Sequence, residues 1–243
     1  MGGFDTLKYA KRDGIGCVTL NRPEALNVYN TQMRDDLFEV LGAIRDDDEV
    51  RAVVVNGEGE KAFCAGADLS EFLSTPPPVA ARRIRFERDV WGLFQSIPQP
   101  LIAALHGFVL GSGIEIALCC DIRLAAEDSR FGLPEVSLGI IPAAGGTQTL
   151  PRTVGTGKAL EWLLTDRWID AREAYRIRLV NRVMPREKLI ESAMEMARKI
   201  ASYHRNAVRC AKQAIMSGMD LPLRQGLDLE RICALKLKTA GPG

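Results

Sequence analysis

The chain has 243 residues, of which 47% are hydrophobic and 26% are charged, a composition typical of a soluble globular protein that builds its own core. Its 32 Lys and Arg nearly balance 31 Asp and Glu, and the net charge of +1 gives no indication of a nucleic-acid or membrane partner. No apolar run approaches the roughly 20 residues of a membrane helix, and residues 1–7 lack the pattern of a secretory signal. We therefore expect a cytoplasmic protein.

The first half of the chain alternates apolar strands with helices. Ile15–Leu20 is predicted as a strand, and residues 33–44 as an amphipathic helix with Thr31 at its N-cap. The Val-rich run at 51–55 is typical of a buried strand. Further predictions in chain order are a loop at 74–78, a helix at 79–97 that buries Ile84, Val90, Trp91 and Phe94, a strand at Leu101–Leu105, an apolar helix at 114–120 and a strand at Ile122–Ala126.

From Gly155 onward the pattern changes, and helical spacing recurs in four segments: 158–164, 171–177, 186–202 and 207–216. We therefore expect an α/β fold, with a strand–helix core at residues 1–150 and a helical region at 151–243. The repeated strand–turn–helix theme favours stacked units over a Rossmann sheet. In addition, no complete GxGxxG motif, the signature of a dinucleotide-binding Rossmann sheet, is present.

The six cysteines and two histidines do not show the spacing of a metal site. No CxxC pair occurs, and most cysteines have apolar neighbours, so we expect free buried thiols in a reducing compartment. His106 and His204 are predicted to be structural.

Two glycine-containing turns could supply backbone donors for an oxyanion. Residues 65–68 read Ala-Gly-Ala-Asp, and Gly111-Ser112-Gly113 precedes the predicted helix at 114–120. A turn or a helix start leaves N–H groups without partners inside the chain. If the two segments converge on one oxygen, they form an oxyanion hole, and the helix dipole adds to its stabilisation.

Glu115 and Glu135 are the candidate catalytic carboxylates. Glu115 lies in the first turn of an apolar helix, where it could instead complement the helix dipole or pair with Arg123 or Arg130. Glu135 is surrounded by apolar residues, and a half-buried carboxylate there is costly unless it is paired or used. Carboxylates transfer protons, so the two residues could act on a substrate that the turns hold.

The chain resembles the crotonase, or enoyl-CoA hydratase/isomerase, superfamily over nearly its whole length. Five segments carry the resemblance in the order and spacing of that family: 21–27 (NRPEALN), 63–69 (FCAGADL), 107–115 (GFVLGSGIE), 131–135 (FGLPE) and 145–148 (GGTQ). The resemblance implies a spiral of stacked ββα units with a C-terminal helical region at 151–243 that mediates trimerisation. It further implies a homotrimer, or a dimer of trimers that forms a homohexamer.

The same resemblance implies a site for an enoyl thioester of coenzyme A, with no metal and no cofactor besides the coenzyme in the substrate. It places the oxyanion hole at the N–H groups of Ala67 and Ser112. Its catalytic residues are Glu115 and Glu135, and the backbone of Ala143 helps to hold the water. The residues implied for binding the acyl-CoA are Arg22, Ala25, Leu26, Ala65, Gly66, Asp68, Leu69, Gly111 and Ala143.

Since both glutamates of the hydratase branch are present, we expect hydration of a 2-enoyl-CoA to a 3-hydroxyacyl-CoA in fatty acid β-oxidation. Our hypothesis gives Glu135 the exchange of the α-proton and Glu115 the activation of the water. The alternatives are a Δ3,Δ2-enoyl-CoA isomerase, which needs one base, and a methylglutaconyl-CoA-type hydratase. A catalytically inactive scaffold ranks low, because both glutamates are retained.

RNA binding, shown by some relatives of the methylglutaconyl-CoA type, is a further alternative. Those relatives present a lysine-rich first helix, whereas here Asp35, Asp36 and Glu39 make it acidic. The basic cluster of Arg82, Arg83, Arg85 and Arg88 is expected to be a solvated helix face. We therefore expect no nucleic-acid partner.

Three features depart from the family pattern. Glu24 and Ser70 stand where relatives often carry a basic residue that contacts the phosphates of the coenzyme. Arg178 stands where glycine is usual, which costs about 1 kcal/mol if the backbone there is left-handed. Family members usually continue with another helix beyond the position of residues 238–243, so the resemblance implies that the region 151–243 is shortened.

Overall fold

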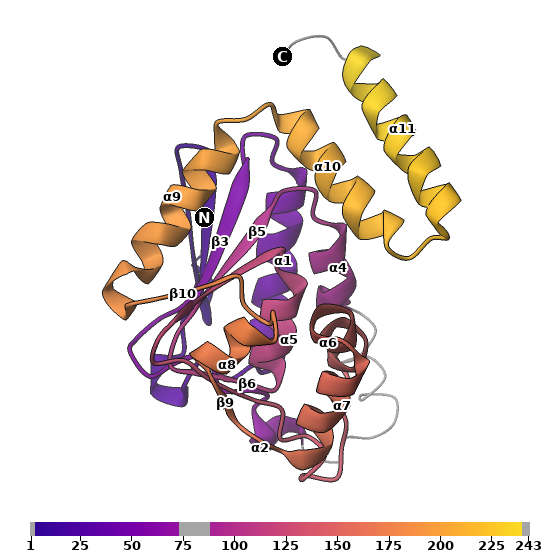
Figure 1. The fold of residues 1–243 in the computed structure, drawn as a ribbon. Coiled ribbons are helices and arrows are strands. Elements are labelled where there is room, and N and C mark those ends of the chain that lie inside the picture. The colour runs from indigo at the N-terminus through magenta and orange to yellow at the C-terminus, as the bar shows by residue number, and fades with distance from the viewer. Residues whose placement is uncertain (1–2, 73–87, 240–243) are drawn as a thin grey trace.

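The computed structural model describes residues 3–72 and 88–239, which form two sheets surrounded by helices (Figure 1). The larger sheet has the strand order β1-β2-β3-β5-β7-β10, and the smaller has β4-β6-β8-β9. The strands are β1 Leu7–Arg12, β2 Ile15–Leu20, β3 Ala52–Gly57, β4 Ala62–Cys64, β5 Leu101–Leu105, β6 Phe108–Leu110, β7 Ile122–Ala126, β8 Arg130–Gly132, β9 Ile169–Asp170 and β10 Arg182–Met184.

The helices pack around these sheets and continue at the C-terminus. They are η1 Pro23–Ala25, α1 Thr31–Asp46, α2 Leu69–Phe72, α4 Val90–Ser96, α5 Ser112–Cys119, α6 Gly146–Val154, α7 Thr156–Thr165, α8 Ala171–Arg176, η2 Arg186–Lys188, α9 Leu189–Ala201, α10 Arg205–Gly218 and α11 Leu223–Thr239. None of the helices within residues 3–72 and 88–239 has the length and apolar character needed to span a membrane.

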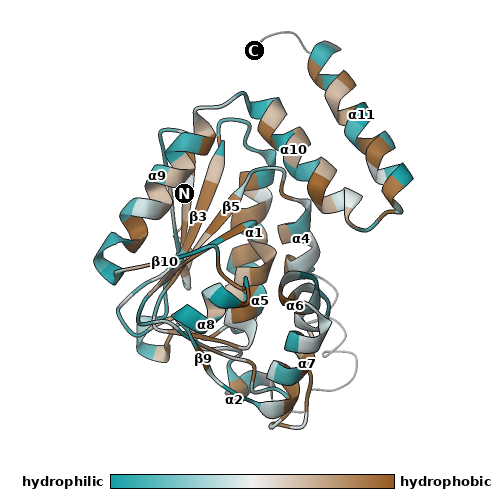
Figure 2. Cartoon of the chain, in the orientation of Figure 1, coloured by the Kyte–Doolittle hydropathy of each residue, from teal (hydrophilic) through white to brown (hydrophobic). Residues whose placement is uncertain are grey.

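The central strands of the larger sheet are buried on both faces. Val53 and Val55 of β3 belong to the main core, on the side of α1, α4 and α5, whereas Val54 belongs to a second core beneath α9. Successive residues of a strand point to opposite faces, so a strand covered on both sides must be apolar throughout. This is the reason for the largely apolar colour of β3 and β5 in Figure 2.

The chain winds between the two sheets in repeated units. β3 leads to β4, β5 to β6 and β7 to β8, and each pair joins one strand of the larger sheet to one of the smaller sheet. Consecutive units stack in parallel, as in the register of Val53 with Leu101. Gly107, between β5 and β6, has φ +54°, and a Cβ there would lie 2.0 Å from Lys61 O of the preceding unit. Glycine is therefore required where the units stack.

Most of the longer predicted elements are confirmed, with two corrections. The strands Ile15–Leu20, Leu101–Leu105 and Ile122–Ala126 have the predicted bounds. Asn30, and not Thr31, caps α1, because Asn30 Oδ1 accepts from Met33 N at 2.9 Å. Of the helix predicted at 79–97, the described part contains α4, in which Val90 and Phe94 are buried but Trp91 is only half-buried. The loop at 74–78, Ile84 and the rest of residues 73–87 lie outside the described residues.

The four helices predicted after Gly155 correspond to α7, α8, α9 and α10. The sequence did not predict α11, or the short strands β9 and β10, which pair with β8 and β7. His204 caps α10, with Nδ1 accepting from Ala207 N at 3.3 Å, which confirms its structural role. The six cysteines are all free, as predicted, but only Cys64, Cys120 and Cys233 are buried.

Arg178 adopts the left-handed backbone that the glycine of relatives would favour, with φ +66°. Replacement of Arg178 by Gly should raise the free energy of unfolding by up to about 1 kcal/mol, because the left-handed strain of a side chain exceeds the entropy that glycine loses on folding. Urea denaturation would measure this change. Arg178→Ala keeps the Cβ and should bring no stabilisation; an equal gain for both variants would assign the effect to the arginine side chain instead.

Candidate active site

The two turns predicted to hold an oxyanion lie against each other. They follow β4 and β6, which are neighbouring parallel strands, so the segments after both strands emerge at the same edge of the smaller sheet. Gly66 has φ +104° and Gly111 has φ +46°. A Cβ on Gly111 would lie 3.5 Å from Gly66 Cα, so the two backbones approach as closely as glycine allows.

Each turn presents an N–H group without a protein partner. Tyr29 N donates to Gly66 O and Asp68 N donates to Tyr29 O, both at 2.8 Å, so the N–H of Ala67 lies on the opposite side of its strand. Ser112 is the first residue of α5, where a helix has no earlier carbonyl to bond. Within residues 3–72 and 88–239 neither N–H donates to another protein group. The pair is therefore available to a ligand, with the positive end of the α5 dipole beside it.

Glu115 is buried in the first turn of α5, with 3% of its surface exposed. Its Oε1 accepts from Ala144 N at 2.8 Å and from Gly146 N at 2.9 Å. Burial raises the pKa of Glu115, and the two N–H groups oppose that shift because they stabilise the ionised form. The carboxylate is thus fixed in place with its second oxygen left for another partner.

The arginines considered as structural partners of Glu115 are engaged elsewhere. Arg123 donates to Leu179 O, Ala117 O and Cys120 O, and so closes the C-terminal end of α5. Arg130 donates to Ser129 O. A buried carboxylate that no arginine of the described residues neutralises is better explained by chemistry than by packing.

Glu135 occupies a different environment, with 9% of its surface exposed and Oε2 buried without a hydrogen-bond partner among the described residues. Burial raises the pKa of Glu135 to about 7; a hydrogen bond from its own backbone opposes the shift, and the charges of Glu115 and Asp166 add to it. A Cβ on Gly111 would lie 2.9 Å from Glu135 Oε1, which places this carboxyl group directly beside the oxyanion turn. Near neutral pH, Glu135 therefore has a proton to give or a site to accept one.

The raised pKa of Glu135 has a consequence for stability. A carboxyl group with a pKa of about 7 in the folded state and 4.5 in the unfolded state stabilises the fold below pH 4.5, and that contribution is lost as the pH rises through 7. The loss amounts to about 3 kcal/mol. Glu135→Gln has no such proton, so its advantage over the wild type should grow by about 3 kcal/mol between pH 4.5 and pH 8, as measured by urea denaturation. A difference that stays constant with pH would contradict the raised pKa.

Most residues implied for acyl-CoA binding gather around the same turns. Arg22 pairs with Asp68 at 3.2 Å and donates to Val28 O at 2.8 Å. Leu26 has φ +53°, and its carbonyl accepts from Ala65 N at 3.0 Å. Ala25 ends η1 beside Leu26, Gly66 and Gly111 form the two turns, and Leu69 is exposed at the start of α2. These placements bring the segments 22–28 and 65–69 together.

Ala143 is exposed, and its N–H makes no hydrogen bond among the described residues. The neighbouring Ala144 and Gly146 hold Glu115 instead, which sequence reasoning missed. The only sequence feature that could have indicated this contact is the Gly145-Gly146 pair. Glycine is needed at 146 because a Cβ there would lie 2.9 Å from Glu115 Oε1. Tyr29, whose backbone holds both sides of Ala67, had no sequence signal.

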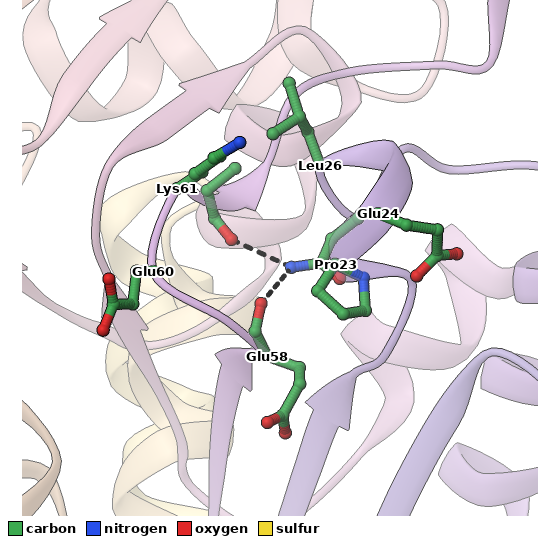
Figure 3. A pocket seen from close by; sticks show the side chains of 8 residues that line it. Pro23, Glu24, Leu26, Glu58, Glu60 and Lys61 are labelled. Atoms are coloured by element: carbon green, nitrogen blue, oxygen red, sulfur yellow. Dashed lines mark hydrogen bonds between the residues drawn. The ribbon is translucent and has the colours of Figure 1, made fainter.

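A cavity of about 430 Å³ opens between η1 and the loop that joins β3 to β4 (Figure 3). Buried Asn27 forms its wall and donates to Glu58 O and Ala62 O, both at 2.9 Å. Its lining consists of Pro23, Glu24, Leu26, Asn27, Glu58, Glu60, Lys61 and Ala62. Glu115 and Glu135 do not line it, and Leu26 connects it to the segment that holds Ala65. The residues that the structure describes contain no group of three or more His, Cys, Asp or Glu suited to a metal ion.

Comparison with known proteins identifies close relatives over almost the whole chain. The sequence pattern of the family described as enoyl-CoA hydratase/isomerase matches residues 10–238. A short-chain-enoyl-CoA hydratase of Clostridium acetobutylicum is 43% identical, over 90% of this chain and 84% of its own. A crotonyl-CoA hydratase of Syntrophomonas wolfei is 38% identical, over 93% of this chain and 87% of its own. The crystal structure of an enoyl-CoA hydratase from Bacillus anthracis superposes with a TM-score of 0.90 at 39% identity, over 95% of this chain and 90% of that one.

Proposed function

The chain belongs to the enoyl-CoA hydratase/isomerase family, and we propose that its site adds water across the 2,3-double bond of a 2-enoyl-CoA to give a 3-hydroxyacyl-CoA. The relatives named as hydratases, at about 40% identity over most of the chain, support an enzyme with hydro-lyase activity in fatty acid metabolism. The solved structures confirm the predicted α/β crotonase fold with its C-terminal helical region.

The observation that carries the proposal is the contrast between the two carboxyl groups beside the free N–H pair. Glu115 is held by two N–H groups, whereas Glu135 Oε2 has no partner and the pKa of Glu135 is raised to about 7. Environments that separate two neighbouring carboxyl groups in this way assign one as base and the other as acid. An isomerisation needs only one of them.

In the proposed mechanism, the thioester oxygen accepts from the N–H groups of Ala67 and Ser112, which stabilise the negative charge that develops there. Each such donor contributes about 3 kcal/mol to lowering the barrier. Glu115 takes a proton from water as the oxygen of the water bonds to the β-carbon. Glu135 gives its proton to the α-carbon. The two groups titrate as a coupled pair, so the microscopic pKa values belong to the pair.

The remaining parts of the proposal concern binding and assembly. The coenzyme portion of the substrate lies along the segments 22–28 and 65–69, and no further cofactor is required. The large apolar side chains exposed on α10 and α11, among them Ile215, Met216 and Leu227, suit burial against other copies in a homotrimer or homohexamer. We place the enzyme in the cytoplasm.

The RNA-binding alternative has little support from the described residues. Arg88 is engaged with Glu39 at 3.1 Å and Asp35 at 3.6 Å, while Arg82, Arg83 and Arg85 lie outside the described residues. Asp36 was expected to contribute to an exposed acidic face of this helix. It is instead buried, and it accepts from Thr6 N and Oγ1.

Two substrates separate hydration from isomerisation. Hydration of crotonyl-CoA removes its conjugated enoyl absorbance, whereas isomerisation of 3-butenoyl-CoA creates that absorbance. We expect the purified protein to turn over crotonyl-CoA rapidly and 3-butenoyl-CoA at least 10²-fold more slowly. The reverse preference would favour the isomerase.

A further inference from the structure

The last two helices form an antiparallel hairpin at the edge of the molecule, with α11 lying along α10 (Figure 1). α10 is anchored to the rest of the protein, since Lys212 Nζ lies 2.7 Å from Asp121 Oδ2 and Arg209 Nη1 lies 2.9 Å from Asp48 Oδ1. The position of α11 therefore depends on its contact with α10.

The register of the hairpin brings two cysteines to the same level. Gly218 and Gly226 mark the closest approach, where a Cβ on Gly226 would lie 3.4 Å from Gly218 O. Cys210 precedes Gly218 along α10 by about 12 Å, and Cys233 follows Gly226 along α11 by about 10.5 Å, at 1.5 Å per residue. In an antiparallel pair these two positions lie at the same level along the hairpin.

The side-chain contacts agree with this register. Cys233 is 3% exposed, and its Sγ donates to Gln213 Oε1 at 3.8 Å. Gln213 lies one turn after Cys210 on the same face of α10. Burial and the neighbouring Cys233 thiol raise the pKa of Cys210. Both cysteines are free thiols in this structure.

We propose that Cys210 and Cys233 form a reversible intrachain disulfide that fixes α11 to α10. A disulfide spans only a short distance between backbones, and the contact of Cys233 Sγ with Gln213, one turn from Cys210, places the two thiols on neighbouring turns of the hairpin. The other cysteines have different neighbours: Cys17 Sγ lies 3.7 Å from Met194 Sδ, and Cys64 Sγ lies 3.7 Å from Gly66 O. The proposal is independent of the hydratase reaction.

The oxidant is a low-molecular-weight disulfide such as oxidised glutathione. Cys210 is the more exposed thiol, so its thiolate attacks one sulfur of the oxidant and expels one glutathione thiolate. The thiolate of Cys233 then attacks the Cys210 sulfur and expels the second. Two protein thiols lose two protons and two electrons, and one glutathione disulfide becomes two thiols. The raised pKa of Cys210 makes the first step slow at neutral pH.

The full chain, incubated with oxidised glutathione, then alkylated and digested with trypsin, should yield residues 210–212 joined to residues 232–236. Reduction should separate the two peptides, and the intact oxidised protein should be 2 Da lighter. Amide hydrogen exchange in α11 should slow by about 10²-fold, the effect expected from closing a loop of this length. If the protein carries the Cys210–Cys233 disulfide but the exchange rate in α11 is unchanged, the disulfide does not fix α11 to α10.

Matched variants complete the test. Cys17→Ser removes a half-exposed thiol that faces no other cysteine, and it should form the link as the wild type does. Cys210→Ser should leave Cys233 fully alkylated and abolish the link. The proposal is overturned if Cys210 keeps a bound glutathione while Cys233 stays free, if either cysteine is joined to another site, or if the link joins two chains on a non-reducing gel.

Discussion

Replacement of Glu115 by Gln should lower kcat for crotonyl-CoA hydration by about 10³-fold, within the range that a general base contributes. The substitution preserves the shape of the side chain, and its amide oxygen can still accept from Ala144 N and Gly146 N. The variant therefore keeps the local structure but cannot take a proton from water. Stopped-flow or steady-state loss of the enoyl absorbance would measure the effect.

Glu135→Gln should lower kcat by a comparable factor, because the proton for the α-carbon is no longer available. Glu161→Gln is the matched control, since Glu161 is an exposed acid on α7 that pairs with Lys158, and its kcat should stay within twofold of the wild type. Retention of more than a tenth of the wild-type kcat by either catalytic variant would remove that residue from the mechanism.

Gly113→Ala should produce a large loss of stability. A Cβ on Gly113 would lie 2.2 Å from Cys64 O and 3.0 Å from Cys64 C. Because these are backbone atoms of the neighbouring unit, no rotamer change can relieve the clash. The free energy of unfolding should fall by about 3 kcal/mol or more, and the Ser112 N–H should move away from Ala67. Urea denaturation and kcat on the folded fraction would report the two effects.

Gly42→Ala supplies the control for this prediction. Gly42 also lies inside a helix, α1, but a Cβ there would meet no atom within 4 Å. This substitution should stabilise the protein by about 0.5–1 kcal/mol, as expected from helix propensity. If Gly113→Ala is tolerated as well as Gly42→Ala, the close approach between α5 and β4 is not as described.

Sequence reasoning worked best where burial imposes a continuous pattern. β2, β5 and β7 are apolar strands covered on both faces, and their bounds follow directly from their composition. The strands of the smaller sheet have two or three residues each, too few for a period to be recognised. α11 was missed for another reason: many of its apolar residues are exposed, so its pattern does not mark a buried stripe.

For the site, the sequence supplied the participants but not their arrangement. The glycines at 66 and 111 indicated two unusual turns, and the structure shows that they meet because β4 and β6 are neighbours. No local pattern could show that Ala144 and Gly146 hold Glu115, since that contact joins segments about 30 residues apart. The absence of a partner at Glu135 Oε2 is likewise a property of the assembled fold.

The most direct test of two-carboxylate hydration is isotope incorporation from labelled water. Crotonyl-CoA incubated with the enzyme in water that carries oxygen-18 and deuterium should give a 3-hydroxybutyryl-CoA with one heavy oxygen at C3 and one deuterium at C2, detected by mass spectrometry. Both labels should be lost together in Glu115→Gln. Deuterium exchange into the enoyl-CoA without heavy oxygen would show a proton transfer that uses no water as nucleophile, and would contradict the hydratase mechanism.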